Sequence, residues 1–116
     1  MKNRTIVFYK DYFEKFFIQL RPSLKNKIVW TLQLIEELEV IPNKFLKYLE
    51  NTNGLYEIRV FHLRNSYRIF CFFDDGNLIV LTTGFHKKTR KTPKKELDRA
   101  ARIKKEYEHE KQDTHT

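Results

Sequence analysis

Residues 67–81 decide how this chain folds, and they read Tyr67-Arg68-Ile69-Phe70-Cys71-Phe72-Phe73-Asp74-Asp75-Gly76-Asn77-Leu78-Ile79-Val80-Leu81. Two apolar, β-prone runs stand on either side of an Asp-Gly turn, which is among the strongest short signals for a β-hairpin. A third such run precedes them, separated by the loop-forming residues 63–66. The sequence therefore predicts an antiparallel meander with strands at Leu55–His62, Tyr67–Phe73 and Leu78–Phe85.

The residues before the meander predict one strand and a helical hairpin. Thr5–Tyr9 is a short β-prone run. Asp11 and Glu14 have capping-box spacing and predict the start of a helix. Pro22 separates it from a second helix, predicted from Ser23 to Glu39. Apolar residues recur at helical steps in both, and we interpret the two stripes as core: Phe13, Phe16, Phe17 and Leu20, then Leu24, Ile28, Leu32, Ile35 and Leu38.

The remaining segments complete an α+β arrangement. Residues 44–50 are predicted to form a short turn of helix, and residues 51–54 a loop. Thr92 and Pro93 predict a last helix that begins at Pro93 and ends near Tyr107. Residues 108–116 are expected to be a frayed tail. The predicted fold is one domain over residues 1–116, in which an N-terminal strand and helical hairpin pack on a mostly antiparallel sheet, followed by a C-terminal helix.

Composition narrows the class of protein. A 116-residue chain that is 41% hydrophobic is long enough to bury a core of ordinary size. No apolar stretch approaches the ~20 residues that a membrane-spanning helix needs, and the N-terminus lacks a signal-peptide core. The lone Cys71 excludes an internal disulfide and, within an apolar strand, is predicted to be a buried structural thiol. We expect a soluble cytoplasmic protein that does not associate with membranes.

Positive charge is concentrated in one segment. Residues 84–106 hold ten Lys and Arg against three Asp and Glu, which accounts for most of the net charge of +8. They begin with Gly84-Phe85-His86-Lys87-Lys88-Thr89-Arg90-Lys91-Thr92-Pro93, at the predicted junction of the last strand and the last helix. With a pI near 9.6, this segment favours a polyanionic partner such as RNA or DNA. A solvated basic surface with no such partner is the alternative.

Side-chain alternation along the three strands sorts the meander into two faces. The face predicted to meet the helical hairpin carries Tyr56, Ile58, Val60, Tyr67, Ile69, Cys71, Phe73, Ile79, Leu81 and Phe85. The opposite, open face carries Glu57, Arg59, Phe61, Arg68, Phe70, Phe72, Val80, Thr82, Gly84, His86 and Lys88.

Two interpretations stay open for the open face. Arg59 and Arg68 suit phosphate oxygens, or Arg59 forms a structural ion pair with Glu57 or a helix carboxylate. The phenylalanines stack on nucleobases, or they are core beneath the last helix or a protein partner.

Several kinds of chemistry are excluded by the residues present. No Cys, His, Asp or Glu grouping has zinc spacing, and three glycines do not make a phosphate-binding loop. We therefore expect neither a metal nor a cofactor. What remains is cation chemistry on a phosphodiester. A lysine crowded by other cations becomes a better base, and Lys87 and Lys88 are the candidates. His86 is a further candidate for proton transfer, or it is an incidental surface histidine.

Three segments in the same order resemble the RelE/ParE superfamily of toxins, and the HigB-like, phage-derived branch most of all. They are Gly54-Leu55-Tyr56-Glu57-Ile58-Arg59, then Tyr67-Arg68-Ile69-Phe70, then Gly84-Phe85-x-Lys87-Lys88-Thr89-x-Lys91-Thr92-Pro93. The last of these is the most specific. With the predicted order of elements, the resemblance covers nearly the whole chain.

The resemblance implies a ribosome-dependent mRNA endonuclease that uses the ribose 2′-hydroxyl as nucleophile and no metal. Arg59 and Arg68 would clamp the scissile phosphate, and Lys87 and Lys88 would add electrostatic stabilisation, one of them serving as base. The basic residues expected to bind RNA around this site are His86, Arg90, Lys91, Lys94 and Lys95. Some relatives use a tyrosine or histidine near the C-terminal end as acid. Only Tyr107 and His109 stand there in this chain, and the general acid is unassigned.

The resemblance also implies partners. These are mRNA on the ribosome and a helix-turn-helix, HigA-like antitoxin, with operator DNA bound only through that antitoxin. Two other functions stay open: a ParE-like toxin that inhibits without cutting RNA, by poisoning gyrase or by binding alone, and a non-toxic nucleic-acid-binding protein.

Overall fold

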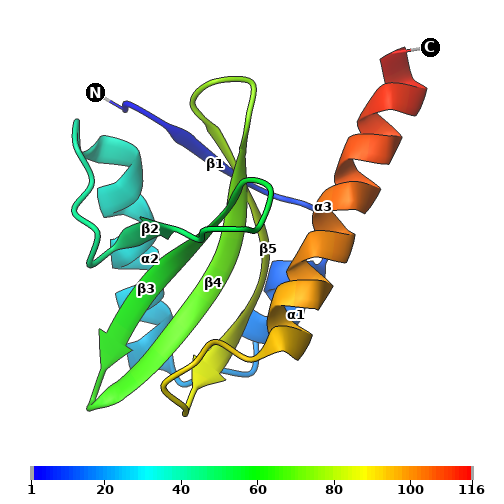
Figure 1. Cartoon of the computed structure of the whole chain (residues 1–116). Coiled ribbons are helices and arrows are strands. Elements are labelled where there is room, and N and C mark those ends of the chain that lie inside the picture. Colours follow the sequence, from blue (N-terminus) through cyan, green and yellow to red (C-terminus); the bar gives the residue numbers. More distant parts are fainter. Residues whose placement is uncertain (1, 116) are drawn as a thin grey trace.

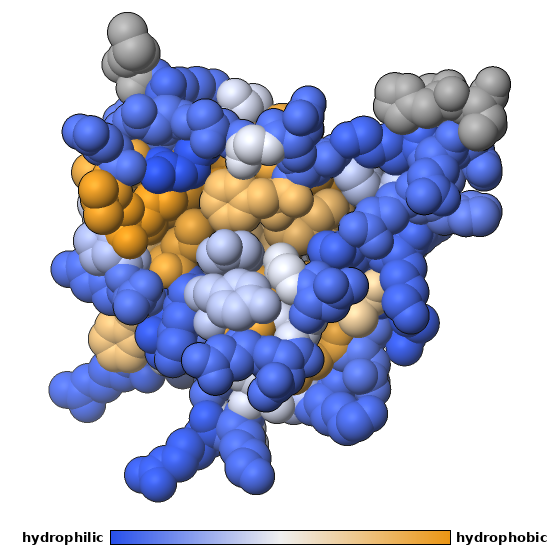
Figure 2. Space-filling view, turned by 45° about the horizontal axis from the view of Figure 1, so that its top comes forward, coloured by the Kyte–Doolittle hydropathy of each residue, from blue (hydrophilic) through white to orange (hydrophobic). Residues whose placement is uncertain are grey.

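The computed structural model describes residues 2–115, so Met1 and Thr116, the ends of the predicted domain, lie outside the described residues. Helices cover both faces of a five-stranded sheet (Figure 1). The surface in view is largely hydrophilic apart from a band of apolar side chains (Figure 2). The elements in chain order are β1 Thr5–Phe8, α1 Tyr12–Phe17, α2 Pro22–Glu37, β2 Leu46–Tyr48, β3 Leu55–His62, β4 Asn65–Asp74, β5 Leu78–Lys87 and α3 Lys94–His115.

The sheet has the order β1-β5-β4-β3-β2. β3, β4 and β5 form the predicted antiparallel meander. β1 pairs with β5 in parallel. A parallel pair needs a long connection, and here it consists of the helical hairpin and the strands β2, β3 and β4. The α+β fold predicted from the sequence is therefore confirmed, with its N-terminal strand, helical hairpin, mostly antiparallel sheet and C-terminal helix.

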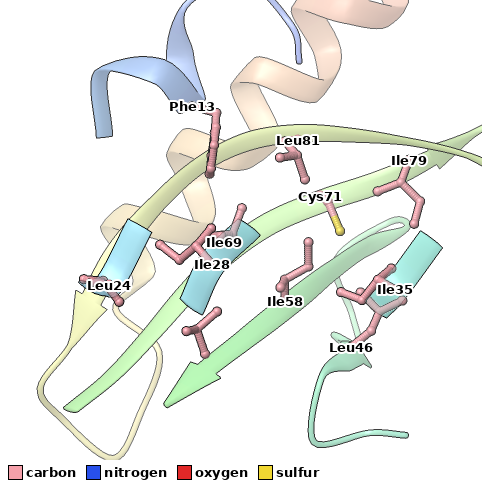
Figure 3. Close-up of a cluster of buried hydrophobic side chains, with 11 residues drawn as sticks. Phe13, Leu24, Ile28, Ile35, Leu46, Ile58, Ile69, Cys71, Ile79 and Leu81 are labelled. Atoms are coloured by element: carbon pink, nitrogen blue, oxygen red, sulfur yellow. The ribbon is translucent and has the colours of Figure 1, made fainter. Parts of the chain in front are cut away.

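One core lies between the sheet and the α1–α2 pair. Side chains at helical spacing on α2 meet side chains that alternate along β3, β4 and β5 (Figure 3). Ile28, Ile58 and Ile69 have no exposed surface. Cys71 is also fully buried here, and burial raises the pKa of its thiol, as expected of a structural cysteine.

A second core lies on the opposite face, under α3. Phe70 and Phe72 of β4 are almost completely buried there, together with Leu55, Val80 and Ala100. The face predicted to be open is therefore partly closed by the last helix. For Phe70 and Phe72, the core interpretation is confirmed. Phe61, at the end of β3, has 65% of its surface exposed and is not part of this core.

A β-bulge in β5 reverses the predicted faces at the end of that strand. Ile69 pairs with Gly84 but Cys71 pairs with Leu81, so Thr82 and Thr83 both lie opposite Phe70. Beyond the bulge, Phe85 packs in the α3 core, whereas His86 pairs with Tyr67 of the α1–α2 core. The predictions that Phe85 points toward the hairpin and that Gly84 and His86 point away are therefore wrong, because alternation assumes an unbroken register.

Two features hold the bulge in place. The hydroxyl of Thr82 donates to the carbonyl of Phe70 at 2.8 Å. At Gly84 the strand passes so close to α1 that an added Cβ would lie 2.6 Å from Cε2 of Phe16. Glycine is therefore required at position 84 by space rather than by backbone angle.

Local patterns misplaced several element boundaries. Residues 46–48 form the edge strand β2 and not a turn of helix, because the open edge of β3 supplies hydrogen-bond partners that local propensity does not record. Asp11 makes no side-chain cap bond, so the predicted capping box is absent; its carboxylate lies 3.4 Å from Lys15 Nζ instead. α1 ends at Phe17 and α2 at Glu37, so Leu20 and Leu38 lie outside the helices to which they were assigned.

The turn between β3 and β4 and the start of the last helix also differ from expectation. β4 begins at Asn65, leaving a two-residue turn in which Leu63 and Arg64 have φ values of 49° and 67°. Two positive φ values match the twist of a tight hairpin, although bulky residues rarely adopt them. The last helix begins at Lys94, whereas the predicted helix begins at Pro93. The carbonyl of Pro93 accepts hydrogen bonds from two backbone N–H groups of the first turn.

The last helix is longer than predicted because charged contacts extend past Tyr107. Residues 108–115 are helical, where a frayed tail was expected. Asp74 at the end of β4 accepts hydrogen bonds from Lys111 Nζ at 2.6 Å and from the Tyr107 hydroxyl at 2.5 Å. Next to these contacts on the helix, Lys10 Nζ lies 2.7 Å from Glu106 and 2.9 Å from Glu110. Local spacing does not reveal these partners, since both Asp74 and Lys10 lie far from the helix in sequence.

The Asp74 contacts predict an acid-sensitive stability. The hydrogen bond from Lys111, and then that from Tyr107, hold the pKa of Asp74 below its ordinary 3.8. A carboxyl whose pKa is lowered by folding stabilises the native state above its unfolded pKa and loses that effect as the pH falls. We expect Asp74→Asn to unfold at lower urea than the wild type near neutral pH. The gap should narrow below about pH 4. A gap that stays constant down to about pH 3 would contradict this account.

Candidate phosphate-binding site

Two arginines face each other across neighbouring strands. Arg59 of β3 is the register partner of Arg68 of β4. Alternation places both on the side of the sheet that holds Phe70 and α3. The side chain of Arg68 is 10% exposed and that of Arg59 is 34% exposed. Arg59 therefore reaches solvent beside an almost buried Arg68.

The carboxylate of Glu57 lies against both guanidinium groups. Its Oε1 is 3.4 Å from Nε of Arg59 and 3.6 Å from Nε of Arg68, and the Glu57 side chain is 6% exposed. Like charges directly opposite each other destabilise a strand pair, so Glu57 offsets the repulsion between the two arginines. The Arg59–Glu57 ion pair, one of the two interpretations of the sequence, is therefore present. It is shared with Arg68, which the sequence did not suggest.

Hydrogen-bonding capacity in this group is unfilled. Glu57 Oε2 and Arg68 Nε are buried without a hydrogen-bond partner among the described residues, while Arg68 Nη1 donates to the carbonyl of Tyr67 at 3.1 Å. Burial lowers the pKa of Arg68; Glu57 raises it and Arg59 lowers it further. An arginine nonetheless stays charged at neutral pH. The exposed guanidinium group of Arg59, next to the second cation Arg68, is an arrangement that suits the oxygen pair of a phosphate.

Lys87 lies on the same face as the arginines, because the bulge turns it there. It pairs in register with Ser66, two residues along the strands from the Arg68–Phe85 pair. Its Nζ donates to the carbonyls of Thr89 and Arg90, at 2.8 and 2.7 Å. In this conformation the ammonium holds the loop that follows β5 and does not point to the guanidinium groups.

The other predicted cations are exposed around the strand-to-helix junction. Lys88, Arg90 and Lys91 lie between β5 and α3, and Lys94 and Lys95 in the first turn of α3. The Thr89 hydroxyl donates to the carbonyl of Lys91 at 2.8 Å, and Lys94 Nζ lies 2.9 Å from Asp98. These side chains form a solvated basic border beside the site.

His86 is separated from the arginine pair by the sheet. Its ring stacks on Tyr67, with centroids 4.7 Å apart. The two rings line a hollow of about 480 Å³ together with His62 and Arg21, on the α1–α2 side. His62 Nε2 lies 3.2 Å from the hydroxyl of Ser23 at the start of α2.

The two residues weighed as a general acid lie elsewhere. Tyr107 is bonded to Asp74, six residues along β4 from Arg68 and therefore about 20 Å away. Burial, and then Asp74, raise the pKa of Tyr107 to about 12. His109 is further along the same helix, 3.6 Å from Asp113. Neither can serve the arginine pair in this conformation.

Comparison with known families identifies the chain. The family model described as Phage derived protein Gp49-like (DUF891) matches residues 15–105. This range includes Arg59, Arg68, Lys87 and Lys88. The chain belongs to the Gp49-like phage-derived protein family. That family is part of the RelE/ParE-like toxin superfamily, as the sequence resemblance predicted, and it is compatible with a toxin of a toxin–antitoxin system. The search of curated proteins found no match.

The Gp49-like chain has two further features that bear on function. No helix among residues 2–115 has an apolar run long enough to cross a lipid bilayer. Among residues 2–113, whose side chains the structure describes, no group of three or more His, Cys, Asp and Glu side chains is placed to share a metal ion. Glu57 was predicted to share the face of the arginines and to be a possible structural partner of Arg59, but it was not counted among the site residues. Its position two residues before Arg59, on the same face of one strand, was the signal for including it.

Proposed function

We propose that this Gp49-like protein is the toxin of a HigB-like type II toxin–antitoxin pair and cleaves mRNA on the ribosome, in the cytoplasm. The observation that carries the proposal is the pairing of Arg59 with Arg68, in which the guanidinium group of Arg59 reaches solvent beside the almost buried one of Arg68. Family membership supports the toxin part of the proposal.

In the proposed reaction the 2′-oxygen of a ribose attacks the adjacent phosphorus and the bond from phosphorus to the 5′-oxygen breaks. The 2′-hydroxyl loses its proton to a base, and the leaving 5′-oxygen gains one. Arg59 and Arg68 hold the non-bridging oxygens, whose charge grows in the transition state. Lys88, exposed beside the strand end, is the candidate base. Lys87 takes that role only after releasing the carbonyls of the loop.

The proposed partners are mRNA in the ribosome and a HigA-like helix-turn-helix antitoxin, through which operator DNA is reached. The basic border of Arg90, Lys91, Lys94 and Lys95 suits the RNA backbone. An apolar hollow of about 280 Å³ suits an antitoxin segment; it lies between β1, α1 and α2, where Phe8 and Val29 are exposed. Exposed apolar surface of this kind is typical of protein contacts.

Primer extension on translated mRNA tests the nuclease. After induction without antitoxin, we expect cuts within translated codons, and none when initiation is blocked. Growth arrest without such cuts would refute the nuclease and favour a ParE-like inhibitor. That alternative has one observation in its favour: neither Tyr107 nor His109, the two residues weighed as the general acid, lies near the arginine pair. Normal growth on induction would favour a non-toxic nucleic-acid-binding protein.

A further inference from the structure

Glu57 lies against both of the arginines that are proposed to hold the scissile phosphate. Its Oε1 lies against the Nε atoms of both guanidinium groups. Because those Nε atoms face the carboxylate, the terminal nitrogens of Arg59 are left for solvent and substrate. The carboxylate itself is buried under the two arginines, out of reach of a ribose hydroxyl. The carboxylate is therefore placed to orient the arginines, but it cannot act as a base toward the substrate.

We propose that Glu57 is a positioning residue that aligns Arg59 and Arg68 for the scissile phosphate and sets the charge of the empty site. This inference rests on the proposed function for its rate effects but not for its binding effects. Two arginines and one glutamate carry a net charge of +1, whereas the arginines alone would carry +2. In a purely structural ion pair the buried polar atoms are hydrogen-bonded. Here Glu57 Oε2 and Arg68 Nε are buried without a hydrogen-bond partner among the described residues.

Charge and position make separable predictions. Glu57→Gln keeps the size of the side chain and removes its charge, so a phosphate meets one more uncompensated cation. Single-stranded nucleic acid should bind more tightly at low salt, and the slope of log K against log salt should steepen by about 0.7. Cleavage of bound RNA should slow, by up to about 100-fold, because the guanidinium groups lose their alignment.

The binding measurement uses a short single-stranded oligonucleotide with 2′-deoxy sugars, which cannot be cleaved by 2′-hydroxyl attack. Its affinity for wild type and Glu57→Gln is measured over a range of salt concentrations. Glu39→Gln is the matched control, because Glu39 is exposed beyond the end of α2. We expect the control to retain the wild-type slope. An unchanged slope for Glu57→Gln, or no binding by wild type and variant alike, overturns the inference.

The rate measurement uses single-turnover cleavage on programmed ribosomes. Glu57→Asp keeps the charge but withdraws the carboxylate, so it should retain the wild-type salt slope and cleave more slowly. If Glu57→Gln does not fold, Glu57→Asp still tests the positioning role. Wild-type cleavage by Glu57→Asp would overturn the positioning role. An inactive wild type would refute the nuclease, while the salt slopes would still decide whether Glu57 sets the charge of the site.

Discussion

Replacing Arg59 with alanine is expected to lower the rate of ribosome-dependent mRNA cleavage by about 10²–10³-fold. Arg59 is the more exposed of the two paired arginines, so its loss removes a transition-state donor with little change in packing. Cleavage is measured as the single-turnover rate at a defined codon, with purified ribosomes and equal amounts of folded protein. The same substitution should abolish growth arrest on induction without antitoxin.

Arg68 calls for a different substitution, because its side chain is almost buried beside Glu57. Arg68→Lys keeps the charge that Glu57 needs but loses the planar fork, so cleavage should fall while the protein stays folded. Arg102→Ala is the control for Arg59→Ala, because it also removes one positive charge, but from an exposed position on α3 beside Tyr12. Full toxicity of both Arg59→Ala and Arg68→Lys would show that the reaction takes place elsewhere.

Replacing Phe70 with alanine is expected to lower the free energy of unfolding by about 3–5 kcal/mol. Phe70 has no exposed surface, and its ring lies 5.4 Å from that of Phe85 in the core under α3. Removing it leaves a cavity that the sheet and helix cannot fill. The measurement is urea unfolding followed by circular dichroism. Phe70→Leu, which fills most of the space, should lose much less stability.

Phe61 provides the matched comparison for Phe70. It lies on the neighbouring strand, on the same face, but is mostly exposed. Phe61→Ala should change the free energy of unfolding by no more than about 0.5 kcal/mol. The pair of variants separates the two interpretations of these aromatic side chains. If Phe70→Ala unfolded at the wild-type urea concentration and bound RNA more weakly, Phe70 would be a stacking platform and its place in the core would be wrong.

The arrangement of the arginine pair could be predicted in part from the sequence. Alternation placed Arg59 and Arg68 on one face, and the loop-forming residues 63–66 made their strands neighbours in one antiparallel meander. Both predictions depend only on local chemistry: a side chain changes face at each strand residue, and a short run of turn-forming residues reverses the chain. The core stripes of α2 were predictable for the same reason, since helical spacing gathers apolar residues on one side.

What only the tertiary structure decided depends on contacts between distant segments. The bulge at Thr82 and Thr83 exchanged the faces of His86 and Lys87, because β5 must pass close to Phe16 at Gly84 while Thr82 bonds to β4. The edge strand β2 exists because β3 offers an open edge. The last turns of α3 are joined to Asp74 and Lys10, far away in sequence. Local patterns record what each residue favours by itself, whereas register, edges and charged contacts depend on which partner the folded chain brings alongside.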